Sequence, residues 1–121
     1  MPCESDPTTT HWTVLVRSAI GGDGRPVLHA LRTALGALAE DIQISLFFLE
    51  DALPVLRSPS LPEFRGYHDL LEEIQELGGR LHAIDWNLDK ENPYTLLPGI
   101  EVSTMAKLIR SIKESDQVIS F

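Results

Sequence analysis

The sequence predicts an α/β fold: a three-layer α/β/α flavodoxin-like sandwich around a five-stranded, mostly parallel sheet. Two observations lead to this prediction. Short β-rich runs alternate along the chain with segments of helical periodicity, and the run at 42–49 is almost wholly apolar, as expected of a strand covered on both faces. Strands separated by helices favour parallel pairing through right-handed crossovers, which places helices on both faces of the sheet.

The first half of the chain is expected to contain two strands and one long helix. The β-rich run 12–17 (Trp-Thr-Val-Leu-Val-Arg) is followed by glycines and then by apolar residues at helical spacing as far as Leu38. Pro26 is compatible with the first turn of this helix, because the N–H that proline lacks has no partner there. The second strand spans 42–49, and residues 50–56 are expected to form a short helix interrupted near a proline.

The second half is expected to contain a loop, two helices and three strands. The loop is 58–62 (Ser-Pro-Ser-Leu-Pro), and the amphipathic helix at 67–77 is stopped by a pair of glycines. The third strand, 81–84, leads into a polar stretch. The remaining expected elements are a strand at 99–103, a helix lined by Met105, Leu108, Ile109 and Ile112, and a closing strand at 117–121.

Length and composition indicate a single domain at 12–121, preceded by a flexible N-terminal arm at 1–11. The formal charge of −8 argues against direct binding of nucleic acid, because phosphate neutralisation needs clustered Lys and Arg. No apolar stretch approaches the roughly 20 residues of a membrane span, and the start of the chain does not resemble a secretory signal. We therefore expect a cytoplasmic protein. Cys3 is the only cysteine, which excludes an internal disulfide.

In parallel sheets, ligands gather at the carboxyl ends of the strands. Three segments follow predicted strands and are the places to search: 18–24, 50–54 and 85–92. In the first, Gly21, Gly22 and Asp23 precede a helix and could bind an anion on backbone N–H groups. The segment lacks the Gly-Lys-Ser/Thr ending of a nucleotide-binding loop, so a plain strand-to-helix turn is favoured.

Carboxylates also collect at these strand ends. Asp23, Glu50, Asp51, Asp85 and Asp89 could together hold Mg²⁺ through oxygen ligands. This gives an alternative function, a small-ligand or Mg²⁺-binding flavodoxin-like domain. Receiver-like magnesium sites need an acidic pair directly after the first strand, which this chain lacks. Solvated acidic loops are therefore favoured, and we expect neither a bound metal nor a cofactor.

His82 alternates with Leu81 and Ala83 in the third predicted strand and is expected to be a hydrogen-bonded core or interface residue. A third hypothesis makes Asp85 a general base with His82 nearby. It is disfavoured because side chains this close along a strand tend to diverge. We expect no catalytic residue in this chain.

Three stretches resemble the DsrE/DsrF sulfur-relay superfamily, and most closely its TusC/DsrF branch. They are 14–25 (Val-Leu-Val-Arg-Ser-Ala-Ile-Gly-Gly-Asp-Gly-Arg), 45–57 (with Leu-Phe-Phe-Leu-Glu-Asp) and 109–121 (ending Ser-Asp-Gln-Val-Ile-Ser-Phe). The resemblance implies a flavodoxin-like sandwich that takes part in handing persulfide sulfur from one protein cysteine to the next. It also implies a homo- or hetero-oligomer with DsrE-like subunits, a trimer or a hexamer, and cysteine-bearing sulfur carriers as partners.

The resemblance places the acceptor cysteine of the sulfur-carrying branch just after the third strand. Here the strand 81–84 exits into Asp85 and Trp86, so no cysteine stands at that position. A thiolate is needed to attack a persulfide, and a carboxylate cannot replace it. We therefore expect a non-catalytic subunit, acting as a structural or regulatory partner in sulfur transfer.

Asp85 and Trp86 are candidates for a ligand or partner pocket, since they occupy the family's working position. The alternative is that Asp85 caps the next turn and Trp86 fills the rim of the core. Glu50, Asp51 and the glycine-rich turn are assigned to the same candidate pocket.

Apolar residues after the second strand could serve a subunit contact. Phe47, Phe48, Leu53, Val55 and Leu56 supply more apolar surface than one short helix should need in a monomer. Either the core takes all of them, or some form a patch that a second subunit covers. The resemblance favours an interface that includes Phe48, Leu53, Val55 and Leu56.

Overall fold

A computed structural model describes residues 10–17, 25–49, 52–53, 56–58, 65–84 and 95–121. Its main sheet has five strands in the order β6-β4-β2-β1-β7, and all four strand pairs are parallel. The strands are β1 (His11–Val16), β2 (Gln43–Leu49), β4 (Arg80–Ile84), β6 (Glu101–Val102) and β7 (Gln117–Ser120). The predicted α/β fold class is therefore confirmed, and each described strand of this sheet overlaps a predicted one.

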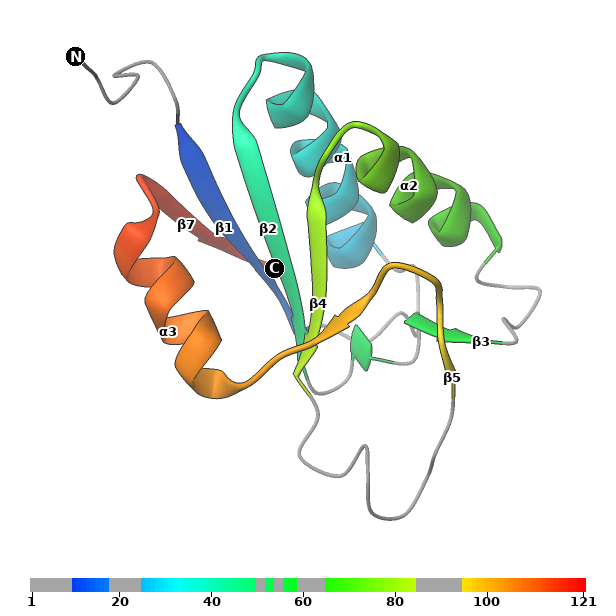
Figure 1. Ribbon diagram of the computed structural model, residues 1–121. Helices are drawn as coiled ribbons and strands as arrows, with labels where there is room; N and C mark the ends of the chain where they lie inside the picture. Colours follow the sequence, from blue (N-terminus) through cyan, green and yellow to red (C-terminus); the bar gives the residue numbers. More distant parts are fainter. Residues whose placement is uncertain (1–9, 18–24, 50–51, 54–55, 59–64, 85–94) are drawn as a thin grey trace.

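Within the described ranges, three α-helices cover the sheet and form the outer layers. The helices α1 (Arg25–Ala39) and α2 (Arg65–Glu76) pack against each other and against one face, whereas α3 (Met105–Glu114) lies on the opposite face (Figure 1). We call these the α1/α2 face and the α3 face. A short antiparallel pair, β3 (Arg57–Ser58) with β5 (Thr95–Leu96), was not predicted. Within the predicted helix at 50–56, residues 52, 53 and 56 are 3₁₀-helical, and the others lie outside the described residues.

Alternation along β2 explains why its sequence is apolar throughout. Ile44, Leu46 and Phe48 belong to the core beneath α1 and α2, whereas Phe47 and Leu49 belong to a second apolar cluster on the α3 face. Successive side chains of a strand point to opposite faces, so a central strand between two helical layers buries both sets.

Two backbone hydrogen bonds end α2 at the predicted pair of glycines. The N–H of Gly79 donates to the carbonyl of Ile74, and that of Gly78 to Gln75, while Gly78 has a φ of +96°. A left-handed residue at this position is the usual end of a helix, and glycine adopts it without strain. The glycines therefore stop the helix as predicted.

The last crossover determines what the α3 face exposes. The chain passes from β6, at one edge of the sheet, through α3 to β7 at the other edge. The apolar side chains of α3 (Met105, Leu108, Ile112) pack over the carboxyl-terminal half of the sheet, against Leu15, Phe47, Leu49 and Ile84. The amino-terminal halves of β2 and β4 have no helix above them in the described structure. Among the described residues, no helix has the length and apolar character of a membrane span.

Candidate functional site

A groove of about 710 Å³ lies on the α3 face, over the amino-terminal halves of β2 and β4. We call it the α3 groove. Strand residues form its floor and α3 forms one wall, because α3 covers only the other end of these strands. The side chains used in the following argument are His11, Ser45, Arg80, His82, Lys107 and Arg110, all of which line it.

His82 lies in the floor of the groove and is held on two sides. Its ring stacks on Phe47 of the neighbouring strand, with centroids 4.3 Å apart and planes 9° from parallel. Its Nδ1 lies 2.8 Å from Ser103 Oγ and 3.1 Å from Glu101 Oε1. Only 7% of the residue is exposed. His82 was predicted to be a hydrogen-bonded core or interface residue, and the structure shows its hydrogen bond and its burial.

Burial lowers the pKa of His82 below its ordinary value of 6.5, because the charged form loses hydration. The carboxylate of Glu101 opposes this shift, whereas the positive charges of Arg80 and Lys107 add to it. His82 is therefore neutral at pH 7. Because Glu101 can only accept a hydrogen bond when ionised, the proton of the neutral ring belongs on Nδ1.

A second polar cluster ties the end of α3 to β1. His11 contacts Ser45 Oγ through Nε2 at 3.0 Å and Ser115 Oγ through Nδ1 at 3.3 Å. Thr13, which is fully buried, bonds through Oγ1 to Ser111 Oγ at 2.7 Å and also to Ser115. His11 was assigned to the arm 1–11 by the sequence, but it is the first residue of β1 and pairs with Gln43.

Charged side chains of both signs surround the groove. Three are basic (Arg80, Lys107 and Arg110) and three are acidic (Asp41, Glu101 and Glu114). Within the described part of the chain, no carboxylate lies within 4.0 Å of the basic groups, and Glu101 is paired with His82. The basic groups are exposed. The groove thus presents cationic donors that have no described carboxylate partner.

The pocket residues predicted from the sequence lie outside the described residues. They are Gly21, Gly22, Asp23, Glu50, Asp51, Asp85 and Trp86. Three described strands lead into them: β1 ends at Val16, β2 at Leu49 and β4 at Ile84, side by side in the sheet. The magnesium alternative depends on the same segments. Within the described ranges, no three His, Cys, Asp or Glu side chains are grouped to hold a metal.

The apolar residues assigned to a subunit contact are placed differently by the structure. Phe48 and Leu56 are fully buried and Leu53 is 7% exposed, all within the core beneath α1 and α2. A side chain already buried by its own chain has no surface left for a second subunit. The interface assignment is therefore wrong for these three residues, because the core of the chain itself takes them. Val55 lies outside the described residues.

Sequence reasoning missed the α3 groove. One signal was present: Arg80 and His82 are two apart in a strand and must share a face. Another was the polar side of α3, where Lys107, Ser111 and Glu114 recur at helical spacing. Neither signal shows that these two surfaces face each other, because that depends on where the last crossover places α3.

Fold and comparisons together define the class of protein. The chain is a three-layer domain with a parallel sheet whose closing helix returns over the face opposite the first two. It belongs to the DsrE/DsrF-like family, whose model matches residues 13–121. The predicted family is therefore confirmed, and its fold is related to sulfur relay.

Two curated relatives are similar over nearly their whole length. The uncharacterized protein MJ0989 of Methanocaldococcus jannaschii is 34% identical over 116 residues, which covers 91% of this chain and 98% of the relative. The uncharacterized protein MK0008 of Methanopyrus kandleri is 34% identical over 115 residues, covering 90% and 92%.

Two solved structures share the fold. The YchN protein of E. coli has a TM-score of 0.76 with 19% identity, over 93% of this chain and 100% of that one. MTH1491 from Methanobacterium thermoautotrophicum, a protein of unknown function, has a TM-score of 0.72 with 18% identity, over 93% and 99%.

Proposed function

We propose that this chain is a non-catalytic DsrE/DsrF-like subunit, a structural or regulatory partner in intracellular sulfur transfer. One observation carries the proposal. The residue directly after β4 is Asp85, at the position where the resemblance expects the acceptor cysteine, and the only cysteine of the chain is Cys3. Family membership supports the connection with sulfur relay.

Chemistry explains why this exchange removes the carrier step. In persulfide transfer, an acceptor thiolate attacks the outer sulfur of a donor persulfide; a new S–S bond forms, and the donor leaves as a thiolate. A carboxylate at position 85 offers no sulfur for that bond. Cys3 is separated in sequence from β4 by three described strands (β1, β2 and β3) and two described helices (α1 and α2).

The proposed partners follow from the family. The chain would assemble, in the cytoplasm, as a homo- or hetero-oligomer with DsrE-like subunits, and this assembly would receive cysteine-bearing sulfur carriers. Asp85 and Trp86 would contribute to that contact, at the position that holds the acceptor cysteine in the sulfur-carrying branch.

Persulfide trapping tests the proposal. The full chain is treated with inorganic polysulfide, separated from the donor, and analysed by intact-mass spectrometry after alkylation. We expect no persulfide that wild type can pass to an acceptor thiol. In a Cys3→Ser background, Asp85→Cys should acquire one sulfur atom and retain it longer than Glu40→Cys, a matched control in an exposed turn.

Two results would contradict the proposal. The first is a stable persulfide on Cys3 of the wild-type chain that is transferred to a second thiol, with transfer lost in Cys3→Ser. The second is an Asp85→Cys variant that behaves like Glu40→Cys, since position 85 would then have no special capacity to hold sulfur.

A further inference from the structure

We propose that the α3 groove binds a small ligand carrying a carboxylate or phosphate oxyanion, held by Arg80, Lys107 and Arg110. The groove lies over the amino-terminal halves of the strands. Position 85 follows the carboxyl end of β4, at the other end of that strand. The two proposals therefore concern different ends of the sheet and can fail separately.

The charge distribution of the chain supports an anionic ligand. The chain has 18 acidic and 10 basic residues, and its net charge is −8. The α3 groove nevertheless collects as many basic as acidic side chains, three of each. The groove therefore departs from the acidic character of the whole molecule, and an anion is repelled less there than over an average part of the surface.

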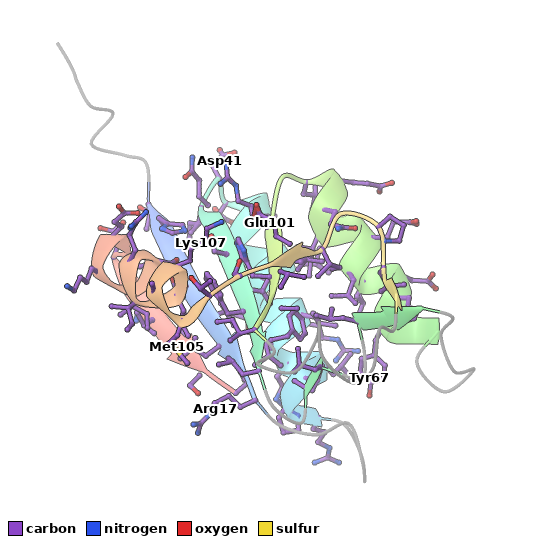
Figure 2. The ribbon with its side chains drawn as sticks, turned by 60° about the horizontal axis from the view of Figure 1, so that its bottom comes forward. Arg17, Asp41, Tyr67, Glu101, Met105 and Lys107 are labelled. Atoms are coloured by element: carbon purple, nitrogen blue, oxygen red, sulfur yellow. The ribbon has the colours of Figure 1, made fainter. Side chains whose placement is uncertain are left out.

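The arrangement of the charges makes the basic groups the available ones. Glu101 lies 3.1 Å from His82, and no ion pair joins it to a basic group among the described residues. Asp41 belongs to the turn before β2 and Glu114 to the last turn of α3, and both line the groove without lying within 4.0 Å of a described basic group. Figure 2 shows Lys107 on the side of α3 that is turned toward the sheet, with Glu101 on the strand across from it.

The basic groups come from two sides of the groove. Lys107 and Arg110 are three residues apart on α3 and line the same wall, while Arg80 begins β4 in the floor. A guanidinium offers two parallel N–H donors that match a carboxylate or a phosphate, and an ammonium adds a point charge. Donors from the floor and from one wall therefore line the same groove.

Size and floor chemistry favour a small molecule. A volume of about 710 Å³ lies within the roughly 300–1,000 Å³ typical of small-molecule sites. The lining also includes Ser45 in the floor, which is hydrogen-bonded to His11, and Ser111 on α3, which is hydrogen-bonded to Thr13. The Phe47 ring is stacked on His82 and is only 2% exposed. A small polar anion fits a lining in which the accessible groups are charged or polar.

Titration of the ¹⁵N-labelled full chain tests this inference. The probes are inorganic phosphate and citrate, each added at constant ionic strength balanced with sodium chloride, because screening alone shifts surface amides. We expect saturable shifts for at least one probe at the amides of Arg80, Glu101 and Lys107. The probe that binds more tightly distinguishes a phosphate ligand from a carboxylate ligand.

Charge-removal variants locate the binding. The double variant Lys107→Gln/Arg110→Gln should weaken the apparent affinity at least about tenfold, as expected when two charge-assisted contacts are lost. Lys113→Gln is the matched control: it removes one charge from the same helix, outside the groove lining, and should change the affinity less than about twofold.

The inference is overturned if neither probe gives a saturable shift at the groove amides. It is also overturned if Lys113→Gln weakens binding as much as the double variant does, because the anion would then respond only to the overall charge of α3. All three side chains are exposed, so these variants should fold like the wild type.

Discussion

His82 stacks on Phe47 across the β2–β4 pair, with ring centroids 4.3 Å apart and planes 9° from parallel. The stack places an ionisable ring in the floor of the α3 groove, next to a fully apolar one. Burial there disfavours the charged imidazolium and lowers the pKa of His82.

The first prediction concerns stability and pH. The pKa of His82 is lowered in the folded protein, so between that value and 6.5 the unfolded chain binds more protons than the native one. Stability contributed by neutral His82 is therefore complete above 6.5 and decreases as the pH falls through this window. Urea unfolding at several pH values should show wild type losing more stability than His82→Gln between pH 7 and pH 5. A difference that does not change with pH would contradict this.

The second prediction concerns the charges around His82. Glu101 raises the pKa of the ring and Lys107 lowers it. Glu101→Gln should therefore lower the pKa of His82, and Lys107→Gln should raise it, as measured by NMR titration of the imidazole. Shifts of the same sign in both variants would mean that a structural change, and not the charge, is responsible.

Loss of the Thr13 hydroxyl should weaken the attachment of α3. Thr13 is fully buried and bonds to Ser111 and Ser115. Thr13→Val leaves those hydroxyls without this partner and should cost about 1–3 kcal/mol in the free energy of unfolding. Thr33→Val, a half-buried position on α1, is the control and should change it by less than about 0.5 kcal/mol. Equal effects of the two variants would contradict the role of the cluster.

Core packing predicts unequal costs for two truncations. Phe48 is fully buried, and Phe48→Ala should destabilise the fold by about 3–5 kcal/mol. Val102 is 51% exposed on the edge strand β6, and Val102→Ala should cost less than about 1 kcal/mol. Chemical denaturation measures both. If Phe48→Ala instead dissociated an oligomer without lowering the stability of the chain, the assignment of Phe48 to the core would be wrong.

Two glycines should respond oppositely to alanine. A Cβ at Gly79 would lie 2.5 Å from Ile74 Cγ2, so Gly79→Ala forces a core side chain to move and should lower the melting temperature. A Cβ at Gly36 meets nothing within 4 Å, and Gly→Ala within a helix stabilises by about 0.5–1 kcal/mol. Gly36→Ala should therefore raise the melting temperature. A rise in both variants would contradict the close contact expected between a Cβ at position 79 and Ile74.

The main elements of this fold could be predicted from local sequence patterns, because each pattern involves residues that are close together in the chain. The wholly apolar run of β2 predicts burial on both faces, and Ile44 and Phe47 lie in different apolar clusters as that requires. The glycines at 78–79 predict the end of α2, and the backbone of Gly78 shows why. The family could also be recognised from sequence, since its model spans 13–121.

The candidate site could not be predicted in the same way, because its parts are far apart in sequence. Nothing near Arg80 indicates that Lys107 will line the same groove, nor does anything near His11 indicate contact with Ser45 and Ser115. The apolar residues Leu53 and Leu56 looked like surplus surface because the extent of the core was unknown. The structure shows that α1, α2 and the sheet enclose them.

By itself, the sequence determined which segments become the strands of the main sheet and the helices α1, α2 and α3, which of their faces are apolar, and that no cysteine follows β4, since each of these depends only on residues close together in the chain. The tertiary structure alone decided that α3 returns over the opposite face and covers half of it. The order of strands sets that crossover, and it leaves His82 and three basic side chains around one open groove.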